Sequence, residues 1–280
     1  MGLMACSDGR TAADPVVQNV IDRLADWGIR ATCGRTLYRQ GHTPFSGSPQ
    51  ARAQQLMDFF TDDRIAAIFD ISGGDSANQI LPYLDYDVIR DHPKPFVGMS
   101  DVSVILNAIY ARSSVPTFHY QIASLAGTDA SAQRARFEQV FLDDRRDYTK
   151  FLTFGYAWLQ GHEMTGSVVG GNIRCFLKLA GTPYLPDPQG KILFLESLGG
   201  GPNRMASLLA QLRQMDYLAQ CRGVLLGTFT QMTAQHLDPT MEELVLDVMH
   251  DYPIPIAVSP DLGHEGNAHC LPIGAPVSFQ

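Results

Sequence analysis

The stretch Phe96-Val97-Gly98-Met99-Ser100-Asp101-Val102-Ser103-Val104-Ile105 decides the fold of this 280-residue chain. It begins as a short apolar run typical of a buried strand, and beyond Ser100 the apolar side chains recur at helical spacing. A sharp turn at residues 98–101 must therefore join a strand to a helix. A serine at such a corner exposes its hydroxyl beside the N–H groups of the helix start, which suits a nucleophile next to an oxyanion hole.

The same turn has a second interpretation. Ser or Asp in front of a helix is commonly an N-cap, and the stretch lacks the second glycine of the usual nucleophile elbow. The choice between capping and catalysis therefore depends on the rest of the chain.

Strands alternate with helices through the first half of the chain. We expect strands at 3–6, 29–33, 65–71 and 95–97, and helices at 14–27, at 49–60 and up to 84. This alternation predicts a parallel sheet with helices on both faces, a Rossmann- or flavodoxin-like α/β domain over residues 1–127. Ligands bind such sheets at the carboxyl ends of the strands, where Ser100 lies.

A glycine pair, Gly73-Gly74, follows another of these strands. Glycine has no Cβ, so the backbone here can approach a ligand closely, although an ordinary turn is the alternative. The surrounding residues match neither a P-loop nor a dinucleotide fingerprint, which disfavours a nucleotide-using enzyme.

The second half of the chain changes character at residue 128. Residues 128–162 predict a connector on the substrate side, with a polar helix at 131–147 followed by aromatic residues. Among these, Trp158 is either a substrate-facing residue or a packed core residue. Residues 163–280 predict a smaller, β-rich α/β domain that ends in a hairpin of 270–273 and 276–279.

Two further polar residues stand just beyond predicted strands. Glu196 closes the apolar run 192–195, and a buried carboxylate is costly unless it has a partner. His264 follows the apolar strand 256–258. With Ser100 they provide a nucleophile, a base and an orienting carboxylate, the three groups of a serine acyl-transfer triad. The alternative is that each has a local role, since the chain has eight histidines.

Composition excludes several classes of function. The net charge of −8 argues against nucleic acid or an anionic membrane surface as partner, and no apolar run approaches the roughly 18 residues of a membrane span. Too few residues precede Cys6 for a signal peptide, so we expect a cytoplasmic protein. No cysteine pair has metal-ligand spacing, and we expect no metal and no cofactor; the cysteines are Cys6, Cys33, Cys175, Cys221 and Cys270.

Ordered sequence blocks along nearly the whole chain resemble one peptidase family, the LD-carboxypeptidases. This family includes murein tetrapeptide carboxypeptidases and microcin C immunity peptidases. The blocks are Ser72-Gly73-Gly74, Leu81-Pro82-Tyr83-Leu84-Asp85-Tyr86-Asp87, Pro93-Lys94-Pro95-Phe96-Val97-Gly98-Met99-Ser100-Asp101, Pro116-Thr117-Phe118, Gly170-Gly171-Asn172, Gly181-Thr182-Pro183-Tyr184-Leu185-Pro186-Asp187, Lys191-Ile192-Leu193-Phe194-Leu195-Glu196 and Gly263-His264.

The resemblance implies a role for each matching residue. Ser100 is expected to be the nucleophile, His264 the base and Glu196 the acid that orients it. The backbone N–H groups of Gly74 and Asp101 are expected to form the oxyanion hole. We also expect the substrate to contact three residues, Gly73, Asn172 and Trp158. The resemblance places this site between the two domains, commonly in a homodimer.

The glycine turn departs from the murein-type pattern. Those members usually carry Arg-Gly-Gly-Tyr-Gly, whereas this chain has Ser72-Gly73-Gly74-Asp75-Ser76, a form closer to the microcin-immunity-like branch. The expected activity is serine-type hydrolysis of an amide near the C-terminus of a small peptide. The bond is either a murein tetrapeptide-type L,D bond, as in cell wall recycling, or the amide of an aminoacyl-nucleotide conjugate. The alternative function is a catalytically inactive two-domain binding protein for a small peptide.

Hydrolysis is expected to survive a strong chelator, because no His, Cys or Asp cluster in the sequence has ligand spacing. The measurement is the initial rate with and without EDTA. Loss of activity that returns on adding zinc would refute the serine mechanism.

Overall fold

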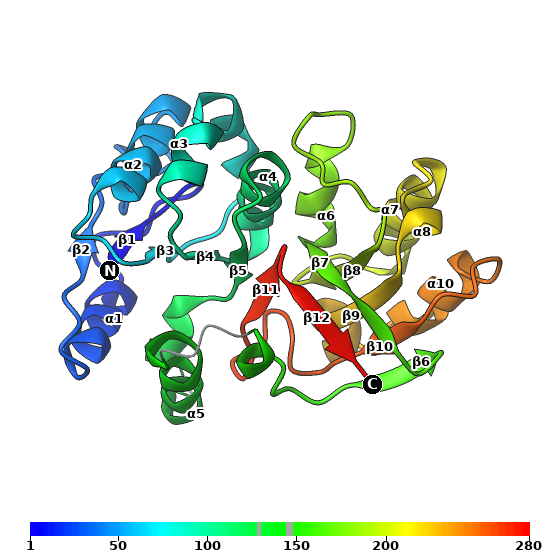
Figure 1. The fold of residues 1–280 in the computed structure, drawn as a ribbon. Helices are drawn as coiled ribbons and strands as arrows, with labels where there is room; N and C mark the ends of the chain where they lie inside the picture. Colours follow the sequence, from blue (N-terminus) through cyan, green and yellow to red (C-terminus); the bar gives the residue numbers. More distant parts are fainter. Residues whose placement is uncertain (128–129, 144–147) are drawn as a thin grey trace.

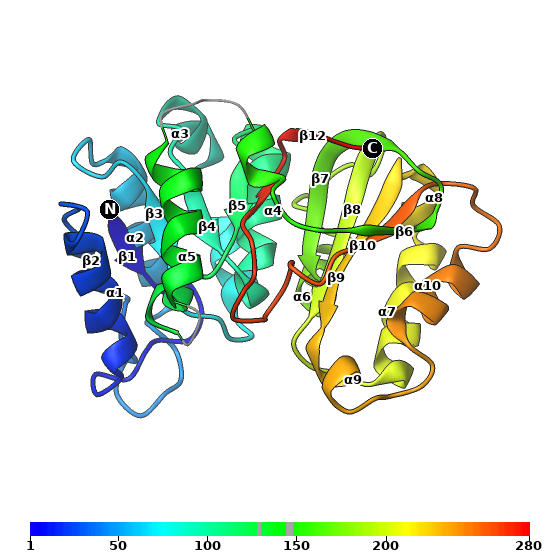
Figure 2. The same ribbon diagram turned by 90° about the horizontal axis from the view of Figure 1, so that it is seen from below.

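The computed structural model describes residues 1–127, 130–143 and 148–280. Two six-stranded sheets lie next to each other, each with helices packed on it (Figures 1 and 2). The expected α/β class with two domains is confirmed. No helix in the described part of the chain combines the length and apolar character needed to cross a bilayer.

The first sheet has the strand order β11-β5-β4-β3-β1-β2. Its strands are β1 (Gly2–Met4), β2 (Thr32–Cys33), β3 (Ile68–Asp70), β4 (Phe96–Gly98), β5 (Thr117–His119) and β11 (Leu271–Ile273). The first five are parallel, and their order 2-1-3-4-5 is the flavodoxin-like one. The order reverses between β1 and β3, so ligands are expected at the carboxyl ends of these two strands.

Helices follow the strands of the first sheet in chain order. They are α1 (Pro15–Ala25), α2 (Pro49–Thr61), the 3₁₀ helix η1 (Ala77–Tyr83), α3 (Tyr86–Asp91), the 3₁₀ turn η2 (Ser100–Val102), α4 (Ser103–Ser113) and the 3₁₀ helix η3 (Ile122–Ala126). The starts of α1 and α2 are encoded locally: Asp14 and Ser48 accept a capping hydrogen bond, and a proline occupies each first turn.

The second sheet has the order β12-β7-β8-β9-β10-β6. Its strands are β6 (Ala157–Gln160), β7 (Met164–Asn172), β8 (Lys191–Ser197), β9 (Gly223–Phe229), β10 (Ile256–Val258) and β12 (Pro276–Phe279). The four central strands are parallel, and both edge strands are antiparallel to their neighbours. The predicted connector thus supplies one edge strand, β6.

The remaining helices belong to the connector and to the second domain. The connector forms α5 (Ala130–Phe137), a π-helical turn η4 (Glu138–Leu142) and the 3₁₀ turn η5 (Thr149–Phe151), and residues 144–147 of the predicted helix lie outside the described residues. The second domain has α6 (Ile173–Phe176), η6 (Leu177–Leu179), α7 (Pro202–Gln214), α8 (Tyr217–Gln220), α9 (Thr230–Ala234) and α10 (Met241–Val248).

The predicted terminal hairpin is wrong. β11 pairs with β5 in the first sheet, whereas β12 pairs with β7 in the second, so the chain end runs from one domain to the other (Figure 1). Gly274, with φ +85°, lies between them, and a Cβ on it would stand 2.2 Å from the Tyr110 ring. Alternating apolar residues predict two strands but not their partners, and each strand here covers a sheet edge.

The two domains meet where α4 packs on β7. The buried Asn107 side chain donates to Gly170 O at 2.7 Å and accepts from Gly170 N at 2.8 Å. A Cβ on Gly170 would lie 2.1 Å from Phe194 O, and one on Gly171 would lie 2.5 Å from Ser103 Oγ. Only glycine allows this close approach, which explains the glycine pair in front of Asn172.

Asn107→Ala is expected to lower the free energy of unfolding by about 2–4 kcal/mol, because the N–H and C=O of Gly170 lose their partner in a buried contact. The measurement is denaturant unfolding, with Asn203→Ala on the exposed start of α7 as the matched control. The control is expected to change stability by less than about 0.5 kcal/mol. Equal losses in both variants would contradict this account of the interface.

Candidate active site

Ser100 lies at the carboxyl end of β4 with φ +61°, a left-handed conformation that is uncommon for a non-glycine residue. The corner is tight, since a Cβ on Gly98 would lie 2.5 Å from Val102 Cγ1. Ser100 is the first residue of η2, and neither η2 nor α4 has a side-chain N-cap. The structure therefore favours a strained corner over the capping interpretation, and strained backbone of this kind is common at active sites.

The glycine pair packs directly against this corner. A Cβ on Gly73 would lie 3.6 Å from Ser100 Cβ. Gly74 has φ +139°, and a Cβ there would lie 2.4 Å from Ser7 Oγ, so another residue would strain and crowd the turn. The Gly74 N–H donates no hydrogen bond to a described residue. It is thus available to a ligand beside Ser100.

The side chain of Asp101 fastens this turn to both domains. Its buried carboxylate accepts hydrogen bonds from Ser7 Oγ at 2.7 Å and from Ala77 N at 2.8 Å, and Lys178 Nζ lies 2.6 Å away. Lys178 also contacts Asp75 Oδ1 at 2.5 Å, immediately after the glycine pair. Sequence analysis assigned Asp101 only a backbone role and missed Lys178, whose partner Asp101 is distant in sequence.

Glu196 and His264 form a direct pair. Glu196 is fully buried in β8, and His264 Nδ1 donates to its Oε2 at 2.5 Å. This bond assigns the proton to Nδ1 and leaves Nε2 able to accept a proton. The buried His264 Nε2 has no hydrogen-bond partner among the described residues. The pair thus has the geometry of an orienting acid and a base.

A second histidine, which the sequence analysis missed, faces the other oxygen of the same carboxylate. His119 Nε2 lies 3.7 Å from Glu196 Oε1, and its ring contacts Phe194 edge-on with centroids 5.2 Å apart. His119 is buried in β5 of the first domain, so the contact crosses the domain boundary. Its position at the carboxyl end of a parallel strand is the signal that could have indicated it.

The two histidines decide the charge of Glu196. Burial raises the pKa of this carboxyl, but the interactions with His119 and His264 outweigh burial and hold the pKa below the ordinary 4.5. At 3.7 Å the His119 contact is longer than a hydrogen bond, so we attribute its effect to charge. Glu196 is therefore ionised at neutral pH.

The loop that carries His264 is held by the connector. The buried Gln133 side chain of α5 donates to Gly266 O at 2.7 Å and to Ala268 O at 3.0 Å. Gly263 has φ +131°, and a Cβ there would lie 2.2 Å from Thr228 Oγ1. The connector thus holds the loop of His264 through hydrogen bonds that the sequence pattern did not indicate.

Trp158 and Asn172 take different positions from the triad residues. Trp158 lies opposite Ala257 on the edge strand β6, packs on the core and meets the Tyr156 ring edge-on at 5.8 Å. Asn172 is buried opposite Glu196 in the sheet register, and its side chain caps α6 through the Cys175 N–H. The structure thus places Asn172 next to the acid and Trp158 in the packing of the second sheet.

Ser100 and His264 line the same pocket, whose volume is about 380 Å³. Gly73 and Gly74 also line it, whereas Trp158 is not among its described lining residues. No hydrogen bond joins Ser100 to His264 in the described structure. The two residues nevertheless line one pocket, which brings together Ser100 of the first domain and His264 of the second.

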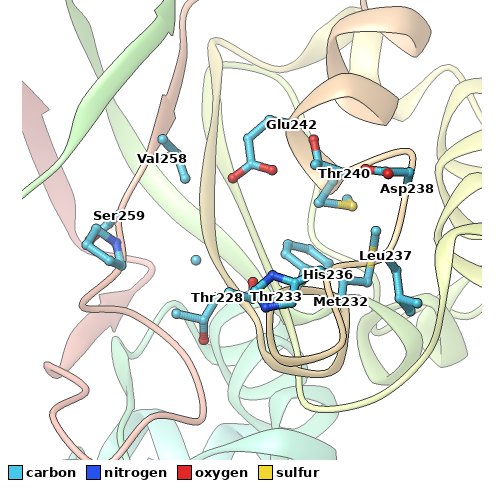
Figure 3. Close-up of a pocket in the computed structure, with 14 residues that line it drawn as sticks. Thr228, Met232, Thr233, His236, Leu237, Asp238, Thr240, Glu242, Val258 and Ser259 are labelled. Atoms are coloured by element: carbon cyan, nitrogen blue, oxygen red, sulfur yellow. The ribbon is translucent and has the colours of Figure 1, made fainter.

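A larger and more apolar pocket of about 650 Å³ lies beside β9, α9 and α10 (Figure 3). Its ionisable lining residues are His236, Asp238 and Glu242, and it is lined by none of Ser100, Glu196 and His264. We therefore take the smaller pocket as the candidate active site, because it contains the expected nucleophile Ser100 and the expected base His264. Within the described ranges, no three His, Cys, Asp or Glu residues gather in a way that could hold a metal ion.

Known proteins of two kinds resemble this chain. The Bacillus subtilis probable murein peptide carboxypeptidase is 29% identical over 263 residues, which cover 91% of this chain and 81% of that protein. The Pseudomonas aeruginosa murein tetrapeptide carboxypeptidase is 27% identical over 285 residues, covering 95% and 92%. The solved microcin C7 self-immunity protein MccF with aspartyl sulfamoyl adenosine has TM-score 0.87 at 21% identity, covering 99% of this chain and 91% of that one.

The family match covers both domains. Residues 1–120 match the LD-carboxypeptidase N-terminal domain, and residues 165–279 match the LD-carboxypeptidase C-terminal domain. Each match contains part of the site, Ser100 in the first and the Glu196–His264 pair in the second. The chain therefore belongs to the LD-carboxypeptidase family.

Proposed function

We propose that the protein is a serine carboxypeptidase with a Ser100-His264-Glu196 triad. The observation that carries the proposal is the buried Glu196–His264 pair, whose Nε2 is left without a protein partner beside the pocket of Ser100. A structural ion pair needs no unpartnered nitrogen next to a strained serine. Membership of a peptidase family supports the same assignment.

The reaction proceeds through an acyl-enzyme. Ser100 Oγ bonds to the scissile carbonyl carbon while His264 Nε2 takes the serine proton, and the N–H groups of Gly74 and Asp101 stabilise the oxyanion. His264 then protonates the leaving nitrogen as the C–N bond breaks. A water molecule next gives a proton to His264 and bonds to the acyl carbon. The bond between that carbon and Ser100 Oγ then breaks, the product carboxylic acid leaves, and His264 returns the proton to Ser100 Oγ. Ionised Glu196 stabilises the imidazolium in both steps.

The substrate is a small peptide or a peptide-like conjugate. A relative named murein tetrapeptide carboxypeptidase supports an L,D peptide bond, and the structural neighbour solved with aspartyl sulfamoyl adenosine supports an aminoacyl-nucleotide conjugate. A pocket of about 380 Å³ fits the terminal residues of either. The family resemblance also supports a cytoplasmic homodimer.

A hydrolysis assay tests the function directly. The two probes are a tetrapeptide whose last bond joins an L-residue to D-alanine and an aminoacyl phosphoramidate of adenosine. Release of D-alanine identifies a muropeptide enzyme, and release of the nucleotide part identifies a conjugate-cleaving enzyme. If neither probe nor any shorter peptide is cleaved by the folded protein, the proposed function is wrong.

Ser100→Ala and His264→Ala are each expected to lower kcat by at least about 10³-fold, because each removes half of the nucleophile–base unit. The double variant is expected to be about as slow as either single variant. Glu196→Gln is expected to lose less, since it alters the orientation and charge of the base without removing it. Fully multiplicative losses in the double variant would mean that Ser100 and His264 act independently, against the proposal.

Glu196 is also expected to make folding stability depend on pH. Its pKa in the folded protein lies below 4.5, so its contribution is fully present above pH 4.5 and is lost as the pH falls through the folded value. The difference in unfolding free energy between wild type and Glu196→Gln is therefore expected to shrink below pH 4.5. Urea denaturation across this range measures it, with exposed Glu163→Gln as control. A difference that grows on acidification would contradict an ionised Glu196.

A further inference from the structure

Four charged residues line the active-site pocket at some distance from the triad, and two of them neutralise each other. Arg10 Nη1 lies 3.2 Å from Asp14 Oδ2, and Arg10 Nε donates to Ile71 O at 2.9 Å. Asp14 also caps α1 through the Val16 N–H. The side chains of Arg10 and Asp14 are therefore already bonded within the protein. The other two charged residues that line the pocket are Arg39 and Asp8.

Arg39 has donors that the described protein does not use. Its Nε donates to Gly9 O at 3.0 Å, which fixes the root of the guanidinium. Its two terminal nitrogens donate to no described residue, and the side chain lines the same pocket as Ser100 and His264. An arginine anchored at Nε and free at both Nη atoms presents a planar fork that matches a carboxylate or a phosphoryl group.

The surrounding loop places Arg39 on the glycine-turn side of the pocket. Gly9 O, which holds Arg39, is one residue from Asp8, and the Asp8 N–H donates to Gly73 O at 3.0 Å. A Cβ on Gly73 would in turn lie 3.6 Å from Ser100 Cβ. These successive contacts connect the guanidinium to the corner that carries the nucleophile.

Asp8 is the second remaining charged residue of the pocket. Its carboxylate accepts no hydrogen bond from a described residue and lies close to Gly74. Burial, and next the charge of Asp101, raises the pKa of Asp8, whereas the positive charge of Arg39 lowers it. The guanidinium of Arg39 is therefore the positive group of this pocket to which an anionic ligand group can bind.

We propose that Arg39 binds the anionic group on the leaving side of the scissile bond: the carboxylate of a terminal amino acid or the phosphoryl group of a nucleotide conjugate. The inference rests on the proposed hydrolase function and adds the residue that selects the chain end. In a terminal amino acid only two bonds of about 1.5 Å each separate the scissile nitrogen from the carboxylate carbon. Recognition of that carboxylate restricts cleavage to the last residue.

The first test compares an acid with its amide. The probes are the tetrapeptide ending in D-alanine and the same peptide with a C-terminal carboxamide. Wild-type protein is expected to prefer the acid by about 10- to 100-fold in kcat/KM, the usual value of a charge-assisted hydrogen bond. In Arg39→Gln the preference is expected to disappear through loss of activity on the acid, with the amide rate unchanged.

Two further variants separate recognition from structure. Arg39→Lys keeps the charge without the fork and is expected to restore part of the preference. Arg35→Gln, a neighbouring exposed arginine paired with Asp58, is the matched control and is expected to leave both rates unchanged. The same series on the aminoacyl phosphoramidate distinguishes the phosphoryl source from the carboxylate source, since only the true substrate loses activity in Arg39→Gln.

Binding is measured separately from turnover by calorimetry on Ser100→Ala with and without Arg39→Gln. The acid is expected to bind Ser100→Ala more tightly than the amide, and the second substitution is expected to remove that difference. If Arg39→Gln leaves the ratio of kcat/KM for the acid to that for the amide unchanged with all probes, the proposed role of Arg39 is wrong. The peptidase function would still stand in that case. Absence of hydrolysis by wild type, with binding still sensitive to Arg39, overturns the peptidase function alone.

Discussion

The rest of the site depends on one buried carboxylate. Glu196 has no exposed surface, and a carboxylate in that position is tolerated only with charged or hydrogen-bonding partners. Its partners come from two places: His264 donates from a loop of its own domain, and His119 approaches from the first domain. The pKa of Glu196 is therefore lowered by one partner from each domain. The carboxylate that pairs with His264 thus lies at the domain boundary.

The close contact of the domains has a simple steric origin. Gly170 and Gly171 allow β7 to approach α4 so closely that side-chain atoms of Asn107 and Ser103 bond the β7 backbone directly. Asn172, the next residue, lies opposite Glu196 in the parallel register. A Cβ on Gly171 would meet Ser103 and His119 of the first domain, so this glycine lets the two domains pack closely beside Glu196. A Cβ on Gly170 would instead collide with Phe194 O inside the second sheet.

The sequence predicted the parts of the molecule that are encoded locally. The corner at Ser100 is a strand, a turn and a helix within ten residues, and Glu196 and His264 each follow an apolar strand, so neighbouring residues suffice to indicate them. His119, Lys178 and Gln133 were missed because their partners are distant in sequence and lie on other elements. The wrong prediction of a hairpin between β11 and β12 has a related cause. Alternation of apolar and polar residues indicates which face of a strand is buried. It does not indicate the partner strand, which depends on which edge of which sheet is free. Trp158 lies in the sequence between the two predicted domains, but it packs on the second sheet and is not among the described residues that line the pocket of Ser100. Position between two domains in the sequence is therefore not enough to predict contact with a substrate.

The two halves of the proposed site are each held by the opposite part of the chain. The glycine turn belongs to the first domain, yet the charge that balances Asp101 and Asp75 comes from Lys178 in the second. His264 belongs to the second domain, yet Gln133 of the connector holds its loop, and His119 of the first domain faces its partner Glu196. An isolated first domain would keep the hydrogen bonds from Ser7 and Ala77 to the Asp101 carboxylate but would lack Lys178, the cation that balances its charge. The proposed acyl-transfer site thus depends on contacts between the two domains, and its pocket is lined by residues of both.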